Sequence, residues 1–429
     1  MKPGIYSEID PLRLIITHRP GVEHDYMTPE NLIEKIDSNS KIIDNPNYLL
    51  FDDLIQTSKA KEEHESFYNI LHTFTDGNCY ELIDLFNFVL KDDDIRKLLI
   101  DECITLEYNL YKTKIKSKDL YKLSVKDLCK TLLSGYLSEK QIFKHPIPNL
   151  IFTRDIAVCI GKTILITSSA KEVRKRENII AKYTFTYHPI FKDYKVFNFQ
   201  ELYPELNIEG GDIIIFDNKN IFIGISERTS LKSIKKIAPL IFKEGFKTII
   251  TIDMPKKRAL MHLDTIFTKI NIDEALIYPP ILDEPSKEIS LFTNSKSSAS
   301  GYNIEAFKNI SFGYIMNKFY TNKINFIKCG SSSKIMQKRE QWTDGANAFA
   351  LSPGKIIGYD CNKYTIKELK KYNYKIITST DYLKDYKKLN ESNQKFVIVI
   401  RCSELSRGRG GPRCLTLPLF RFNLKTNKK

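Results

Sequence analysis

The sequence predicts an α/β fold in which repeated β-hairpins form a propeller-like or barrel-like array, interrupted by a bundle of inserted helices. Two patterns support this prediction. Four segments after Pro148 share one plan, in which a small or acidic residue precedes an apolar run, a turn and a second apolar run. Between Pro46 and Pro146 there is no proline, and most of that stretch carries apolar residues at helical spacing. The hydrophobic fraction of 42% is enough for a sizeable core.

The hairpin plan recurs at intervals of roughly 50 to 80 residues, which is typical of arrays built from one supersecondary unit. The four units are RDIAVCIGKTILIT at 154–167, GGDIIIFDNKNIFIGIS at 210–226, LDTIFTKINIDEALIY at 263–278 and GANAFALSPGKIIGYD at 345–360. Around a common axis, Asp155, Asp212 and Asp264 would fall at the same end and converge on one pocket. The alternative is a set of unrelated hairpins in an α+β domain, in which these acids only end their strands. The repetition favours convergence.

The helical stretch predicts a separate unit. CYELIDLFNFVL at 79–90, IRKLLIDECITLEYNLY at 95–111 and VKDLCKTLLSGYL at 125–137 each fit one amphipathic stripe. We therefore expect four or five helices in an insert over 75–143, with 1–74 and 144–429 forming one α/β domain.

Further elements are expected near the ends of the chain and after the second hairpin. LRLIITHRP at 12–20 is predicted to contain a strand, and a helix is expected to begin near Pro29. SLKSIKKIAPLIFKEG at 230–245 is predicted to be a helical or loop segment, and CLTLPLFRF at 414–422 to be a strand that opens directly after a glycine-rich loop.

Composition argues against a membrane protein and gives no strong indication of a nucleic-acid partner. No stretch reaches the roughly 18 uncharged apolar residues of a membrane span, and the charged first residues do not resemble a signal peptide. We therefore expect a soluble, cytoplasmic protein. The net charge of +14 would suit nucleic acid, but the lysines are scattered along the whole chain, which favours a solvated surface.

The eight cysteines contain no CxxC pair and no neighbouring histidine cluster, so no zinc site is expected. Seven of them are expected to be free, mostly buried thiols. Cys414 is the exception, because it ends SRGRGGPRC at 406–414, where arginines and a loose backbone favour a thiolate. An RNA-binding arginine-glycine segment is the alternative, but this one runs straight into an apolar strand.

Four short motifs carry candidate chemistry, and each is ambiguous alone. They are SRGRGGPRC with Cys414 and the three that follow. FTRD ends in Asp155, EGGD begins with Glu209, and HLDT places His262 and Asp264 two residues apart, on the same side of a strand. Together with Cys414 they supply carboxylates, an imidazole and a thiol. Carboxylates grip the edges of a planar guanidinium, a soft nucleophile adds to its carbon, and a base handles ammonia and water.

In this order, the motifs resemble those of the arginine deiminase family. The matching segments are HRPGVEHDYMTPENL at 18–32, LLFDD at 49–53, PNLIFTRD at 148–155, EGGD at 209–212, GISERTS at 224–230, MHLDTIFT at 261–268, REQWTDGAN at 339–347 and SELSRGRGGPRC at 403–414. The resemblance implies a five-bladed α/β propeller of the pentein type with an inserted helical bundle. It also implies hydrolysis of L-arginine to L-citrulline and ammonia through a covalent amidino-cysteine intermediate.

The resemblance assigns roles to single residues. Cys414 corresponds to the nucleophile, His262 to the general acid and base, and Glu209 to the carboxylate that orients it. Asp155 and Asp264 correspond to the pair that binds the guanidinium. The predicted contacts to the rest of the substrate are Asn149, Arg174 and Arg228 at its carboxylate, the carbonyls of Leu50 and Gly408 at its amino group, and Arg409 in a mobile closing loop.

The resemblance also implies a homo-oligomer with L-arginine as its substrate, and no metal, cofactor, membrane or nucleic acid is expected. Within the segment VRKREN at 173–178, Arg176 is a second candidate for the Arg174 role. The chain departs from the family pattern at Cys361, where arginine is common, in GSSS at 330–333 and in LIQTSKA at 54–60. Alternatives are another guanidino-modifying hydrolase, an amidinotransferase, or a basic nucleic-acid-binding or adhesion protein.

Overall fold

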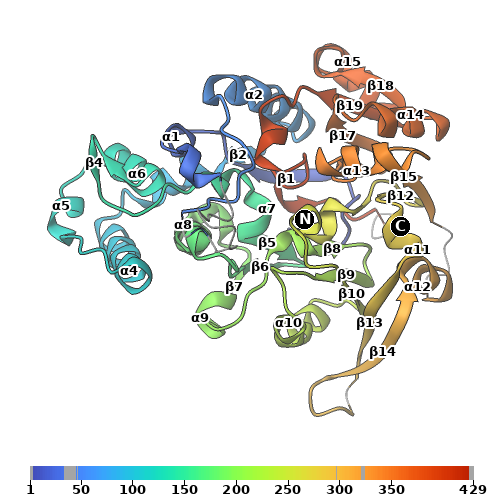
Figure 1. The fold of residues 1–429 in the computed structure, drawn as a ribbon, viewed down its shortest axis with the longest axis horizontal. Helices are drawn as coiled ribbons and strands as arrows, with labels where there is room; N and C mark the ends of the chain where they lie inside the picture. Colours follow the sequence, from blue (N-terminus) through green and yellow to red (C-terminus); the bar gives the residue numbers. More distant parts are fainter. Residues whose placement is uncertain (1–2, 33–44, 46, 296, 320–323, 425–429) are drawn as a thin grey trace, which may run out of the picture.

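A computed structural model describes the chain except residues 1–2, 33–44, 46, 296, 320–323 and 425–429 (Figure 1). The described residues form an α/β fold with five sheets of three or more strands and one short two-stranded sheet. Each of the five sheets contains the same unit, an antiparallel pair whose second strand is flanked by a parallel strand.

The five units have these bounds, in the order first strand, second strand, parallel strand. They are β5 (Ala157–Ile160), β6 (Thr163–Ile166) and β7 (Lys195–Asn198); β8 (Ile213–Ile215), β9 (Asn220–Ile225) and β10 (Thr248–Asp253); β11 (Phe267–Lys269), β12 (Glu274–Ile277) and β15 (Asn325–Lys328); β16 (Phe349–Ser352), β17 (Lys355–Tyr359) and β19 (Phe396–Ile400); β20 (Leu417–Arg421), β1 (Leu12–Thr17) and β2 (Cys79–Glu81). The remaining strands are β13 (Pro285–Asn294) beside β10, β14 (Tyr302–Ser311) beside β13, β18 (Lys375–Thr378) beside β19, and the pair β3 (Tyr136–Leu137) and β4 (Lys140–Gln141).

All four hairpins predicted from the sequence are present, as β5–β6, β8–β9, β11–β12 and β16–β17. The fifth unit joins the two ends of the chain, because β20 pairs antiparallel with β1, with Leu417 opposite Ile16. Both strands were expected from their apolar runs, but their pairing was not. The last strand begins at Leu417, so the prediction that it opens at Cys414 is wrong.

The helices of the expected insert are α3 (Leu82–Val89), α4 (Asp93–Tyr111), α5 (Ser117–Tyr121) and α6 (Val125–Ser134), and α4, α5 and α6 lie together at one side of the molecule (Figure 1). The Asp92 carboxylate caps α4, and Gly135 ends α6 with a φ of 82°. One prediction here is wrong, because Cys79–Glu81 form the strand β2 rather than helix. These residues pair in parallel with β1, which outweighs their helical pattern.

The remaining helices connect the strands and cover the sheets. They are α1 (Val22–Asp25), α2 (Thr57–Phe74), α7 (Thr153–Ile156), α8 (Lys175–Tyr187), α9 (Phe199–Leu202), α10 (Leu231–Lys243), α11 (Pro280–Asp283), α12 (Phe312–Phe319), α13 (Lys334–Trp342), α14 (Lys363–Lys371) and α15 (Ser379–Glu391). Of the helix and the loop left open after the second hairpin, the segment forms the helix α10. Near Pro29 the described residues form only a 3₁₀ turn, Pro29–Asn31, and residues 33–44 lie outside the description. Among the described helices, none has the length and apolarity needed to cross a membrane.

Short helical turns stand immediately before three of the hairpins and carry the predicted acids. Asp155 lies in α7, Asp212 in the 3₁₀ turn Gly210–Asp212, and Asp264 in the 3₁₀ turn Leu263–Thr265. The turn at 210–212 contacts both of the others. The repeated unit therefore brings the three acids together from distant parts of the sequence.

Candidate active site

A small pocket of about 20 Å³ lies where these turns meet; we call it the Cys414 pocket. It is lined by Leu50, Asn149, Phe152, Asp155, Arg174, Arg228, Arg258, Met261, His262, Thr265, Gly408, Arg409 and Cys414. Asp212, which was predicted to converge on one pocket with Asp155 and Asp264, does not line it. Of the residues to which the resemblance assigns roles, only Glu209 and Asp264 are missing from this lining. Both lie directly behind it, in contact with His262 and Cys414 respectively.

His262 precedes the 3₁₀ turn at 263–265 in an extended conformation, so the prediction that HLDT is a strand is wrong. The backbone N–H of Leu263 donates to Asp212, and the hydroxyl of Thr265 donates to the His262 carbonyl, which closes a turn instead. Gly211 packs beneath the imidazole, where a Cβ would lie 2.7 Å from its ring. Only glycine allows this approach, which explains the second glycine of EGGD.

Two carboxylates hold the imidazole of His262. Its Nε2 lies 2.7 Å from Oε2 of Glu209, and its Nδ1 lies 3.8 Å from Oδ1 of Asp155. Burial lowers the pKa of His262, but Asp155 and Glu209 outweigh burial and raise that pKa to about 9. The imidazole is therefore protonated at neutral pH.

Glu209 is itself fixed from several sides. The backbone N–H of Ala170 donates to its carboxylate at 3.0 Å, and the guanidinium groups of Arg228 and Arg174 lie 3.7 and 3.8 Å away. Burial raises the pKa of Glu209, but Arg228, His262 and Arg174 together hold it well below its usual range. The group that orients His262 is therefore a permanent anion.

Asp155 and Asp264 are each half satisfied. One oxygen of Asp155 accepts from Arg174 at 2.7 Å, and one oxygen of Asp264 accepts from Arg413 at 2.7 Å. In both residues the other oxygen, Oδ1, is buried and has no hydrogen-bond partner. A buried carboxylate oxygen without a donor is costly, so this arrangement is suited to a ligand that brings N–H groups.

Cys414 lies beside Asp264, with its Sγ 3.6 Å from Oδ2, and its backbone N–H donates to the side chain of Asn347 at 3.2 Å. Burial, Asp264 and Asp155 raise the pKa of the thiol well above its ordinary value. The expectation of a thiolate in the free protein is therefore wrong. Asn347 was not singled out in the sequence, although it lies in the family segment REQWTDGAN.

The arginines of SRGRGGPRC are engaged with other partners, which explains that error. Arg413 binds Glu8 and Asp264, where it shares Oδ2 of Asp264 with the sulfur, and Arg407 reaches the Leu54 carbonyl at the surface. Arg409 stacks on Trp342 at 3.5 Å from the ring centroid, and two of its buried guanidinium nitrogens have no acceptor. Proximity in the sequence predicted positive charge next to the sulfur. The charged groups that shift the pKa of Cys414 are instead the carboxylates of Asp264 and Asp155.

A family model described as arginine deiminase matches residues 47–421, which is most of the chain. The chain belongs to the arginine deiminase family. The arginine deiminase of Borrelia recurrentis is 33% identical over 99% of this chain and 99% of its own length. That of Mycoplasma capricolum subsp. capricolum is 32% identical over 100% of this chain and 99% of its own. The resemblance inferred from the motifs is thereby confirmed.

Among solved structures, a similar one is the product-bound N-terminal domain of ArgZ, an arginine dihydrolase from the ornithine–ammonia cycle in cyanobacteria. It covers 95% of this chain and 97% of its own, with a TM-score of 0.51 at 14% identity. At that identity the likeness concerns the fold alone, and it confirms the predicted α/β class.

Of the two arginines in VRKREN, the structure places Arg174 at the pocket of this arginine deiminase family member. Its guanidinium donates to Asp155, Glu177 and the Asn149 carbonyl, and burial raises the pKa of Glu177 to about 8. Arg176 turns away and donates to the carbonyls of Leu132 and His145.

Arg258 lines the pocket and was missed in the sequence. Its Nη2 donates to the carbonyl of Leu50 at 2.6 Å and lies 3.3 Å from Asp52. Leu50 has a φ of 67°, a left-handed conformation that is uncommon outside glycine. Arg258 thus occupies the carbonyl that was predicted to receive the substrate amino group. Nothing in KKRALM, at 256–261, distinguishes this arginine in the sequence.

Two further features concern a possible metal site at the pocket and a second, larger cavity. Oxygen and nitrogen atoms of Asp155, Glu209 and His262 lie close enough to hold a metal ion, but they are engaged with one another and with Arg174. A larger cavity of about 850 Å³, lined among others by Lys256, Trp342 and Phe312, contains none of the predicted site residues.

Glu209→Gln is expected to change the pH dependence of catalysis. Because the pKa of His262 is raised to about 9, the imidazole stays protonated up to that pH. We expect the rate to fall at higher pH, since His262 is assigned as the general acid. Glutamine removes the anion that stabilises the imidazolium, so the pKa of His262 falls and the basic limb of the kcat profile moves toward neutral pH. The check is kcat against pH for both proteins, with Glu201→Gln at the surface as the control. A basic limb at the same pH in the variant would exclude this role for Glu209.

Proposed function

We propose that this chain hydrolyses L-arginine to L-citrulline and ammonia through a covalent adduct on Cys414. The observation that carries the proposal is the pair of buried, unsatisfied carboxylate oxygens of Asp155, which lines the pocket together with Cys414, and of Asp264, which contacts the thiol. A guanidinium has five N–H donors in one plane, so two carboxylates can hold its edges while its carbon faces the sulfur.

The substrate must enter by opening the pocket, since about 20 Å³ holds roughly one water molecule. Arg258 and Arg409 are the side chains to move, because Arg258 covers the Leu50 carbonyl and Arg409 lies in the glycine-rich segment. The substrate amino group then binds the carbonyls of Leu50 and Gly408. Its carboxylate binds Asn149, Arg174 and Arg228, of which Arg228 lies 3.7 Å from Glu209.

The first chemical step begins with a neutral thiol. Binding of the guanidinium cation between Asp155 and Asp264 offsets the two charges that raise the pKa of Cys414, so the thiol loses its proton to solvent when the substrate arrives. The thiolate adds to the guanidinium carbon. The protonated His262 then donates its proton to one terminal nitrogen, the carbon–nitrogen bond breaks, and ammonia leaves.

The second step reuses the now neutral imidazole. His262 takes a proton from water, and the resulting hydroxide adds to the same carbon. The carbon–sulfur bond then breaks and the new hydroxyl group loses its proton to solvent, which releases citrulline and the thiolate. Glu209 remains ionised throughout and stabilises the imidazolium whenever it forms. Every role is filled by a protein side chain, so no metal or cofactor takes part in this scheme.

The same proposal covers the finer architecture. We assign the five units as five blades of an α/β propeller, supported by their common strand order and by the pairing of β20 with β1 that joins the chain ends. The division into 1–74 with 144–429 and an insert over 75–143 is kept, except that β2 belongs with β1 by its hydrogen bonds. Homo-oligomeric assembly and a cytoplasmic location stay predictions from the sequence.

The direct test is citrulline and ammonia release from purified protein. L-Arginine is expected to give both products in equal amounts, whereas agmatine is expected to react poorly because it lacks the carboxylate. Faster release from agmatine or from dimethylarginine would favour another guanidino-modifying hydrolase. Transfer of the amidino group to an added amine would indicate an amidinotransferase, and no reaction with any of them would overturn the proposal.

A further inference from the structure

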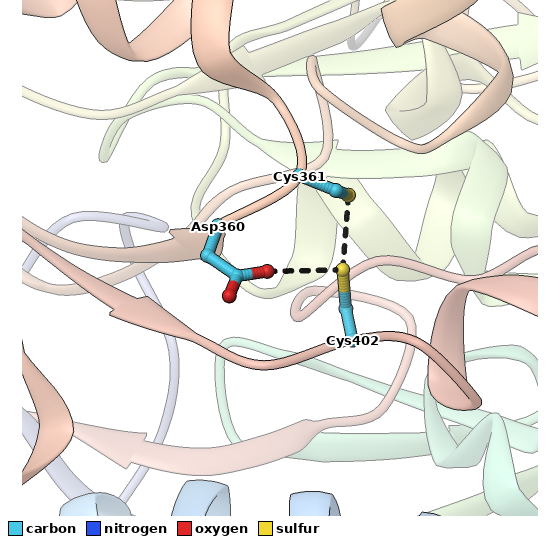
Figure 2. A group of neighbouring side chains, drawn as sticks. All are labelled: Asp360, Cys361 and Cys402. Atoms are coloured by element: carbon cyan, nitrogen blue, oxygen red, sulfur yellow. Dashed lines mark hydrogen bonds between the residues drawn. The ribbon is translucent and has the colours of Figure 1, made fainter.

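Two cysteines outside the Cys414 pocket lie against each other (Figure 2). Strands β17 and β19 are parallel neighbours, and their register ends with Tyr359 opposite Ile400. Cys361 and Cys402 each lie two residues beyond that pair, and their Sγ atoms are 2.9 Å apart. Cys402 also lies 3.5 Å from Oδ1 of Asp360. The parallel register itself therefore sets the two thiols side by side.

The environments of the two thiols differ in a way that suits oxidation. Among the eight cysteines, all in the described part of the chain, Cys361 is exposed and the others, Cys402 included, are buried. The S–H of Cys402 donates toward Cys361 and lowers the pKa of Cys361, whereas it raises that of Cys402. An accessible thiol of lowered pKa next to a second thiol is the arrangement of redox-sensitive cysteine pairs.

We propose that Cys361 and Cys402 form a reversible disulfide when the protein meets a peroxide. The thiolate of Cys361 attacks one peroxide oxygen, the oxygen–oxygen bond breaks, and Cys361 becomes a sulfenic acid with release of water or an alcohol. The thiol of Cys402 then attacks the sulfenic sulfur, loses its proton, and displaces water. The two thiols lose two electrons in total, the peroxide gains them, and a thiol reductant reverses the reaction.

A metal site is the competing use of the same side chains, because Asp360, Cys361 and Cys402 present three potential ligand atoms. Structural zinc sites use four protein ligands, usually cysteine and histidine. In the described residues no fourth such ligand joins this group, and two of its three members are exposed. The geometry therefore favours the disulfide.

Cys402 is the first residue of segment 402–414, which ends at the proposed nucleophile Cys414. The carbonyl of Cys402 accepts from the N–H and the hydroxyl of Ser406, at 3.1 and 2.6 Å, and so begins the 3₁₀ turn Leu405–Gly408. The hydroxyl of Tyr359 donates to the Gly410 carbonyl at 2.8 Å. A disulfide would thus link the start of segment 402–414 to the residues that follow β17. The last residue of β17, Tyr359, already donates to the middle of that segment. We expect slower amide hydrogen exchange in 403–412 after oxidation.

Trypsin separates the relevant cysteines, which makes the proposal directly testable. Cleavage after lysine and arginine puts Cys361 on peptide 356–363, Cys402 on 402–407 and Cys414 on 414–421. The reduced protein is treated with hydrogen peroxide, free thiols are alkylated, and the non-reduced digest is analysed by mass spectrometry. We expect 356–363 joined to 402–407, lighter by two hydrogens than the two peptides together and separated again by dithiothreitol.

Two variants and a metal measurement make the result decisive. Cys361→Ser should abolish the link and leave Cys402 free to be alkylated, whereas Cys103→Ser in the helical region should not affect the link. Separate alkylation of both peptides after peroxide, or a link to 414–421 instead, would overturn the proposal. So would one zinc ion per chain in the native protein that protects both thiols, since the group would then be a metal site.

Discussion

Cys414→Ser is expected to leave the fold intact and to lower the turnover of L-arginine by at least roughly 10⁴-fold. A serine hydroxyl stays protonated in the same surroundings, where burial and two aspartates already raise the pKa of the thiol well above its ordinary value. A guanidinium carbon is a poor electrophile, so a neutral hydroxyl does not add to it at a useful rate. Substrate binding should survive, because Asp155 and Asp264 are unchanged.

The measurement is citrulline formation together with arginine binding by calorimetry. Cys361→Ser is the matched control, since it makes the same chemical change at an exposed cysteine outside the pocket, and under reducing conditions it should retain activity. A Cys414→Ser protein that turns over arginine at near the original rate would exclude the thiol from the chemistry.

Asp264→Asn is expected to have the second largest effect. An amide replaces one charged acceptor, so the lost interaction with the guanidinium costs about 1.5–3 kcal/mol, and a misplaced carbon adds to that cost. The same change removes one of the charges that raise the pKa of Cys414, so the thiol should ionise more easily in the free protein. Turnover and thiol reactivity should therefore move in opposite directions.

This opposition separates a substrate-binding role from a structural one. In the variant, kcat/KM should fall by a factor on the order of 10² or more, while alkylation of Cys414 at fixed pH becomes faster. Thermal unfolding controls for the loss of the ion pair with Arg413, which lies 2.7 Å from Asp264. A variant with unchanged kcat/KM would show that Asp264 serves only to hold Arg413. Asp155→Asn is expected to lower turnover for the same reason.

The repeated hairpins were predictable because their signal is local. Alternation of apolar runs around Gly161 or around the turn at 217–219 depends only on neighbouring residues, and each of these hairpins is present. The strand β2 was not predictable from its own residues, because its partner β1 lies more than sixty positions earlier in the sequence. The same holds for the pairing of β20 with β1, which depends on the tertiary fold.

The site was predictable to the extent that residue type determines the chemistry. The nucleophile, imidazole and carboxylates named from the motifs lie in or directly behind one pocket. What failed was the direction of side chains. The guanidinium of Arg413, adjacent to Cys414 in sequence, is engaged with Glu8 and Asp264, and HLDT closes a turn rather than extending as a strand. Arg258 follows no pattern, since its role depends on the carbonyl of Leu50 on a distant segment.

The most direct test of the account is to trap the adduct on Cys414. In His262→Asn the imidazole that activates water is gone, so hydrolysis of the adduct slows; its formation slows too, because ammonia departure also uses His262. Arginine is mixed with the variant, the reaction is quenched in acid, and the mass of the tryptic peptide 414–421 is measured. The proposed adduct raises the mass of this peptide by that of one arginine less one ammonia, whereas an amidinotransferase would add only the mass of the amidino group. A peptide of unchanged mass at all times from milliseconds to minutes would contradict covalent catalysis, and would instead favour direct attack of water on a guanidinium held by Asp155 and Asp264.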